Sequence, residues 1–209
     1  TMTGASVLTV DGNRFQNAGK NQNVTTPGAT PRGTYAGLSV YGNTTNHNEF
    51  KVNTSIGITD ARAGYTDAAK GGSDFNKLEI SNGVITNAYA GFSRATQASD
   101  ADRKADASAK ANAKKNVAEV SGGAITNLYG GALTGAAASG DATENAVKVS
   151  GGTVTNLYGG ALTGAAASGD ATRNEVKVSG GTVTGTIYGG ALTDAAATGS
   201  ATKNTVTIT

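Results

Sequence analysis

Residues able to perform acid–base or nucleophilic chemistry are few in this chain, and their spacing does not bring them together. The only histidine, His47, stands in the segment GNTTNHNEF with no nucleophile at a recognisable spacing. The densest carboxylates are Asp100, Asp102 and Asp106, whereas carboxylate catalysis needs two such groups converging on a cleft. Cysteine is absent, which excludes disulfides and thiolate metal sites. The sequence therefore predicts a protein that is not an enzyme and uses no metal or cofactor.

A recurring aromatic position is the best candidate for binding. Tyrosine followed by Ala-Gly or Gly-Gly recurs along the chain, and arginine replaces it once: the members are Tyr35, Arg62, Tyr89, Tyr129, Tyr158 and Tyr188. Because an unpaired arginine is not stable in a dry core, we expect this column at the surface, with the preceding Leu128, Leu157 and Ile187 pointing inward. Two roles stay open, namely stacking that stiffens a corner and a strip that contacts sugar rings or a partner's side chains.

Internal repetition shows what must position these residues. The segment TNLYGGALTGAAASGDAT occurs at 126–143 and again, unchanged, at 155–172. An asparagine heads each copy of the pattern, at Asn48, Asn76, Asn116, Asn145, Asn174 and Asn204, with intervals of 28, 40, 29, 29 and 30 residues. Repeat periods of 20–50 residues are typical of solenoids. We expect the asparagines to form a structural ladder, since stacked amides can bond from one coil to the next.

Each asparagine precedes an alternating run such as NAVKV or NEVKV, which predicts a strand with one buried face. A coil then consists of strand, Gly-Gly corner, strand, second Gly-Gly corner and a small-residue loop. The glycines at 122–123, 151–152 and 180–181 fit tight corners. The prediction is an all-β, right-handed parallel β-solenoid of about six coils, about 29 residues each, forming one domain over 1–209 and starting with SVLTV at 6–10.

The alternation also predicts the core and the register. The expected buried residues are Leu8, Val10, Phe50, Val52, Leu78, Ile80, Ala118, Val120, Val147, Val149, Val176, Val178, Val206 and Ile208. Three neighbouring pairs of opposite charge support this stacking: Glu49 with Lys77, Lys51 with Glu79, and Glu119 with Lys148. Two like-charged pairs count against it, Glu79 with Glu119 and Lys148 with Lys177.

Two segments depart from the repeat. A polar excursion at 13–33 separates the first strand from the rest of its coil, and an Ala/Lys/Asp-rich insertion at 92–115 lengthens one interval. The insertion favours helix, and it is read either as a solvated arm or as a partner-binding excursion. The chain stops at NTVTIT, so we expect either that the natural protein continues or that this strand edge pairs with another chain.

The motif N-x-V-x-V-S-G-G-T-V-x-x-L-Y-G-G-A, as at 174–191 with one inserted residue and isoleucine for leucine, resembles β-helical passenger repeats of Gram-negative autotransporter-type adhesins. GGAI at 122–125 and the GGAL copies are also similar to short motifs of chlamydial polymorphic outer-membrane proteins, but their FxxN partner motif does not recur. The autotransporter resemblance covers about 48–209. It implies an extracellular or cell-surface rod serving as adhesin, spacer or effector carrier, and no functional residue carries over.

Composition narrows the partners. Hydrophobic residues make up 37%, aromatic residues 5%, and Gly accounts for 31 positions, too little large apolar mass for an ordinary globular core. The net charge of +2 predicts no nucleic-acid partner, and without a run of 18 apolar residues we expect no membrane insertion. The leading hypothesis is a rod that binds a protein or glycan of a host or neighbouring cell. A fibre of copies paired end to end and a carbohydrate-active β-helix enzyme are the alternatives.

Overall fold

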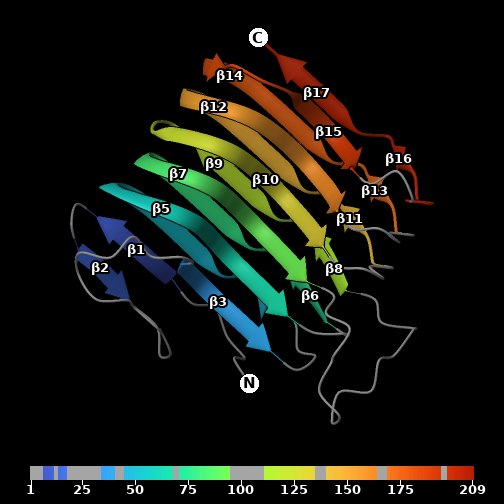
Figure 1. Cartoon of the computed structure of the whole chain (residues 1–209), viewed down its shortest axis with the longest axis horizontal. Helices are drawn as coiled ribbons and strands as arrows, with labels where there is room; N and C mark the ends of the chain where they lie inside the picture. The colour runs from blue at the N-terminus through green and yellow to red at the C-terminus, as the bar shows by residue number, and fades with distance from the viewer. Residues whose placement is uncertain are drawn as a thin grey trace.

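The chain forms parallel strands stacked one above another in a computed structural model that describes residues 7–11, 14–17, 34–40, 45–67, 71–94, 111–134, 140–163, 169–193 and 197–209. These strands make a β-solenoid, and within the described ranges no residue is helical. In Figure 1 the strand colours run in order from blue at one end of the stack to red at the other, so each coil contacts the coils before and after it. This confirms the predicted fold class.

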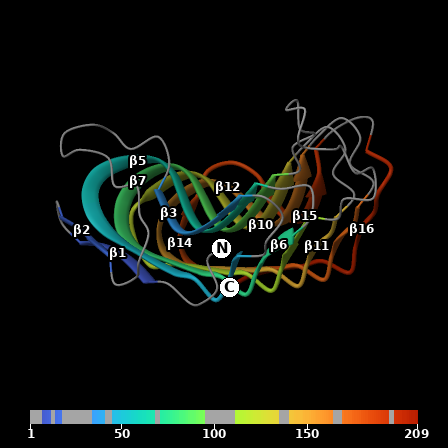
Figure 2. The ribbon, with the colours of Figure 1, turned by 90° about the horizontal axis from the view of Figure 1, so that it is seen from below.

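Two sheets build the solenoid, one of 11 strands and one of 6. The larger sheet contains β1 (Val7–Asp11), β2 (Arg14–Asn17), β3 (Thr34–Val40), β5 (Glu49–Asp67), β7 (Lys77–Arg94), β9 (Val117–Val120), β10 (Ala124–Thr134), β12 (Ala146–Thr163), β14 (Glu175–Val183), β15 (Ile187–Leu192) and β17 (Thr205–Ile208). The smaller sheet contains β4 (Thr45–Asn46), β6 (Gly71–Asp74), β8 (Ala111–Lys114), β11 (Ala142–Thr143), β13 (Ala171–Thr172) and β16 (Ala201–Thr202). Figure 2 shows the long strands β5, β7 and β12 curving around the coil.

The register agrees with the charge pattern. Every opposite-charge and like-charge pair expected from the sequence is a pair of strand partners, in β5–β7, β7–β9, β9–β12 and β12–β14. Lys77 relieves the contact between Glu79 and Glu119, because its Nζ forms ion pairs with both carboxylates. A like-charged pair in a ladder is therefore tolerated where one of its two strands also carries a counter-ion within reach of both charges.

The interior has a main core and a smaller one. The main core holds the alternating residues of the first strand segments, including Phe50, Leu78, Val147 and Val176, all with no exposed surface. The smaller core lies where the long strands end beside the smaller sheet and consists of Ala113, Leu133, Ala142, Leu162 and Ala171. Few large apolar residues are needed to fill the two cores, because each coil contributes only one thin layer to them.

The ends of the stack differ from the expectation. The solenoid has about four turns of about 29 residues, fewer than the six expected. At one end β2 runs antiparallel to β1, and at the other β17 has only β14 as a partner in the larger sheet. Val206 and Ile208, predicted to be buried, are 43% and 66% exposed because no coil covers them. The predicted burial of Leu8 and Val10 concerns side chains outside the described part.

The two departures from the repeat are only partly described. Within 13–33, β2 covers Arg14–Asn17, and residues 18–33 lie outside the described ranges. Within 92–115, β7 continues to Arg94 and β8 begins at Ala111, so the expected helix and the carboxylates Asp100, Asp102 and Asp106 fall in the part that is not described. Each segment therefore contains strand where it is described, and the helix expected within 92–115 stays a prediction.

The two glycine pairs of each coil have different structural roles. Gly123, Gly152 and Gly181 have φ of 88°, 81° and 82°, so the first pair makes the expected corner. The second pair was also predicted to be a corner, and this was wrong: Gly130 and Gly131 lie inside β10 with no positive φ. A Cβ added at Gly131 would sit 2.5 Å from Cγ of Asn145, so glycine is needed there to make room for the asparagine.

Candidate functional site: ladders along the solenoid

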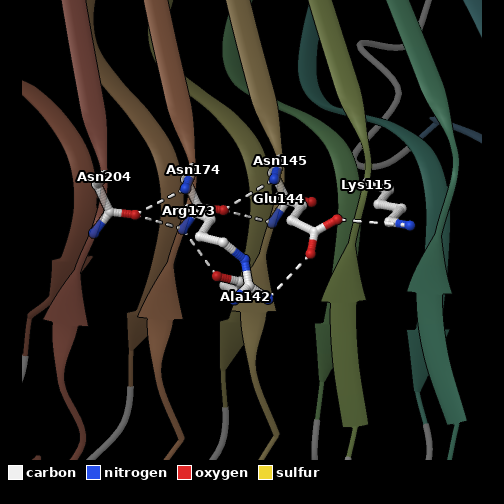
Figure 3. A network of polar contacts seen from close by, with 7 residues as sticks. All are labelled: Lys115, Ala142, Glu144, Asn145, Arg173, Asn174 and Asn204. Carbon is white, nitrogen blue, oxygen red and sulfur yellow. Dashed lines mark hydrogen bonds and ion pairs between the residues drawn. The ribbon is translucent and has the colours of Figure 1, made fainter.

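The asparagines that head each coil form a buried amide ladder. The Nδ2 of each donates to the Oδ1 of the next asparagine at 2.8–3.0 Å, from Asn48 through Asn174 to Asn204. The same Oδ1 atoms also accept the backbone N–H of the preceding asparagine at 2.9–3.0 Å. The second N–H donates to a carbonyl of the smaller sheet, as Asn174 does to Ala142 in Figure 3.

This buried ladder satisfies its polar groups almost completely. Asn116 and Asn145 have no exposed surface, and each uses both Nδ2 hydrogens and its Oδ1. Buried amides are costly unless they are hydrogen-bonded, and aligned bonds polarise one another in a medium of low dielectric. The ladder therefore joins the two sheets in every coil and each coil to the next.

A left-handed turn residue places each asparagine in the interior. The residues just before the ladder have φ between 54° and 57°: His47, Phe75, Lys115, Glu144, Arg173 and Lys203. Their side chains are exposed and contact one another along the stack, with Glu144 bonded to Arg173 at 3.0 Å and paired with Lys115 at 3.6 Å (Figure 3). His47, the only histidine, stacks on Phe75 with ring centroids 5.2 Å apart. The sequence did not reveal this turn, because such conformations favour Gly, Asn or Asp.

The tyrosine column is a continuous aromatic stack. Ring centroids are 4.7 Å apart from Tyr89 to Tyr129, 4.7 Å from Tyr129 to Tyr158 and 5.4 Å from Tyr158 to Tyr188, with planes within 15° of parallel. Burial raises the pKa of Tyr129 to about 12, and burial with the neighbouring Tyr129 also raises the pKa of Tyr89. Because the rings cover one another's faces, only their edges and hydroxyls face outward, and Tyr188 at the end is 45% exposed.

Arg62 replaces tyrosine in this column and sits in an aromatic box. Its guanidinium carbon is 4.8–5.3 Å from the ring centroids of Tyr35, Tyr65, Tyr89 and Phe92. Asp60 lies 3.3 Å from Nη2, and Nη1 donates to the Tyr35 hydroxyl at 3.1 Å. As expected of an arginine away from bulk water, Arg62 is not unpaired: cation–π contacts and an ion pair allow its side chain to be only 12% exposed.

A second amide ladder, which sequence reasoning missed, runs beside the tyrosines on the outer face. Asn156 donates to Asn127, Asn127 to Asn87, and Asn87 to Asp60, each at 2.9 Å. Its donors point toward the start of the chain, opposite to those of the buried ladder, and end on the Asp60 carboxylate. The signal was present in the copies as asparagine two residues before tyrosine, in NAY and NLY. We call this set of residues the outer ladder.

A groove was also missed. It has a volume of about 680 Å³ and lies across the adjacent strands β5, β7, β9, β12 and β14. Its lining combines Lys51, Glu79, Glu119, Lys148 and Lys177 with the serines at 81, 121, 150 and 179. Sequence reasoning used these charges only to check the register, because their joint exposure on one face follows from the stacking.

The described residues hold few groups for chemistry. No cluster of three or more His, Asp or Glu side chains able to bind a metal ion is found among them. In the same ranges, no helix is long and apolar enough to cross a membrane. What the structure does bring together are three columns of like residues: the buried asparagines, the outer ladder and the stacked tyrosines.

Comparisons with protein families, curated sequences and solved structures find no match for this chain. The resemblance to autotransporter passenger repeats therefore stands on the sequence motif alone.

Proposed function

We propose that this chain is a non-enzymatic, surface-exposed or secreted β-solenoid rod that acts as the spacer or adhesin part of an autotransporter-like passenger region. The observation that carries the proposal is the buried asparagine ladder, which is hydrogen-bonded from Asn48 to Asn204 in every coil. A spacer must keep its length under load, and a ladder that crosslinks every coil resists both bending and stretching.

The tyrosine stack supports the same proposal. Four rings in face-to-face contact add a second continuous element on the opposite side of the strand from the main core. With their faces covered, these tyrosines suit stiffening better than sugar stacking, which needs a free aromatic face. In the adhesin role, the free ring face of Tyr188 and the outward edges of the column are the contact points for a protein or glycan.

The proposal is tested by measuring the binding of beads coated with the protein to glycan arrays and to cultured cells. Saturable binding that weakens in Tyr188→Ala, with Tyr158→Phe as a matched control that keeps the stack, supports the adhesin role. Absence of binding together with a rod-shaped particle in small-angle X-ray scattering supports the spacer role. A compact particle without rod shape contradicts both, and turnover of a bound glycan contradicts the non-enzymatic assignment.

A second candidate function is a fibre of solenoids paired end to end. It is favoured by β17, which pairs with β14 on one side and carries the exposed side chains of Val206 and Ile208. Negative-stain electron microscopy over a concentration series tests it. Filaments formed by the wild type and lost in Val206→Lys support the fibre, whereas isolated rods at every concentration reject it.

A further inference from the structure

The first strand segment of every coil presents two outward columns, which together we name the charged strip. The first column contains Glu49, Lys77, Val117, Ala146, Glu175 and Thr205, and the second contains Lys51, Glu79, Glu119, Lys148, Lys177 and Thr207. The charges along the second column follow the order plus, minus, minus, plus, plus. The order read from the other end is different, so the way in which a second copy can align with this strip is restricted by charge.

We propose that two copies of this chain associate side by side and antiparallel through the charged strip, about a two-fold axis that is parallel to the strands and lies between β9 and β12. Such an axis keeps each column opposite itself and reverses the order of the coils. Glu79 then faces Lys177 of the second copy, and Glu119 faces Lys148 of the second copy. Each contact occurs twice because the interface is symmetric.

The first column agrees independently with the same axis. Its Lys77 faces Glu175 of the second copy, so a third pair of opposite charges forms. At the centre, Val117 faces Ala146 of the second copy, and both are half-buried small apolar residues. At the ends of the strip Lys51 and Glu49 face threonines, which are neutral. No like charges meet anywhere along the strip in this arrangement.

Other antiparallel registers in which three or more coils overlap do not have this property. An axis that passes through β9 places Glu119 opposite Glu119 of the second copy. An axis that passes through β12 places Lys148 opposite Lys148 of the second copy. An axis between β7 and β9 opposes Glu79 to Glu119, and one between β12 and β14 opposes Lys148 to Lys177. Since like charges in contact penalise the wrong partner, electrostatics favours the proposed register over these antiparallel alternatives.

The side chains needed for this contact are accessible. Glu79, Glu119 and Lys148 keep 32%, 35% and 55% of their side-chain surface exposed, although each also has an ion-pair partner in its own chain. In the described part of the chain, Glu175 and Lys177 make no ion pair. A carboxylate has room for more than one cation, so the contacts within the chain and between copies are compatible.

The strip is narrow, and its pairs are exposed to solvent, so the association is weak and sensitive to salt. Analytical ultracentrifugation of the full chain should detect dimers at about 0.01 M salt, where charges act over roughly 30 Å, and monomers at about 1 M, where they act over roughly 3 Å. Lys177→Glu should raise the dimer Kd about tenfold or more, because two attractions become repulsions. Lys203→Glu has the same change in net charge outside the strip and should leave the Kd unchanged.

Mixing variants tests the axis itself. Lys177→Glu and Glu79→Lys should each fail to dimerise alone and should form mixed dimers when combined, since both charge contacts are then restored. A separate pair, Glu49→Cys and Thr205→Cys at opposite ends of the first column, should form a mixed dimer with a short bismaleimide linker, because the native chain has no cysteine. The linker should give no dimer of either variant alone, because two copies of the same cysteine then lie five strand spacings, roughly 24 Å, apart.

Monomers at every concentration and at low salt would overturn the proposal. Dimers that charge mixing does not restore, or that the cysteine pair does not capture, would overturn it as well. That outcome would indicate a parallel arrangement, in which Lys177 faces Glu175 of the second copy and mixing has no effect. The cysteine test keeps the result decisive if Glu79→Lys does not fold, which circular dichroism would show.

Discussion

The buried asparagine ladder and the outer ladder are built from the same side chain at the same coil spacing, yet their surroundings differ. The buried ladder lies against glycines such as Gly131 and uses every hydrogen of its amides. The outer ladder is half-buried, makes one amide bond per coil and ends on Asp60. Water can replace a lost partner in the outer ladder and not in the buried one, so equal bonds contribute unequally to stability.

The largest effect is expected from Asn145→Ala in the buried ladder. This change removes the acceptor of one Nδ2 hydrogen and of the backbone N–H of Asn116, and the donor to the Ala113 carbonyl, in a dry interior. We expect a loss of about 3 kcal/mol or more in the free energy of unfolding, since each orphaned buried group costs about 1–3 kcal/mol. Urea unfolding followed by circular dichroism measures it, and an unchanged midpoint would show that the ladder is dispensable.

A slightly smaller loss of unfolding free energy is expected from Gly131→Ala. This substitution tests whether glycine is needed at this position to make room for the Asn145 side chain. The new Cβ would lie 2.5–2.6 Å from the side-chain atoms of Asn145, so the rigid ladder must move. Overpacking of this kind costs about 1–3 kcal/mol. Gly57→Ala is the matched control, because a Cβ there has nothing within 4 Å. Equal midpoints for the two variants would refute the packing role of Gly131.

Asn127→Ala, the outer counterpart of the first substitution, should cost about 1 kcal/mol or less. It removes the bond that Asn127 donates to Asn87 and the bond that it accepts from Asn156, both at a half-buried surface where water takes their place. The difference between Asn145→Ala and Asn127→Ala in the same urea experiment measures what burial adds. If the two losses were similar, the contrast between the ladders would fail.

The two faces also differ in their response to pH. Amides do not titrate, whereas the Tyr129 phenol beside the outer ladder has its pKa raised by burial to about 12. A raised folded-state pKa means that stability is intact below about pH 10 and falls as the pH rises toward 12, where the unfolded chain has already lost the proton. Tyr129→Phe should flatten this decline in urea midpoints between pH 9 and pH 11.5 at constant salt. An identical slope in both chains would assign the decline to other groups.

Residue order predicted much of this molecule. Period and alternation were enough for the β-solenoid, for the asparagine positions and for a register in which Lys51 meets Glu79 and Glu119 meets Lys148. These features depend on the alternation within each coil and on the spacing between successive coils, and both can be read from the order of residues. The same reasoning was wrong for the second glycine pair, because glycine at a corner and glycine under a side chain look alike in a sequence.

Tertiary structure alone decided which columns of residues are buried and which are exposed to solvent. The aromatic box around Arg62 draws Tyr35, Tyr65 and Phe92 from different coils, and the left-handed turn is carried by residues such as Phe75 and Arg173 that show no preference for it. The sequence by itself determined that one unit repeats along an axis, since the period can be read from the order of residues. Burial, ring stacking and the face on which charges meet depend on how neighbouring coils cover one another, and only the folded stack contains that information.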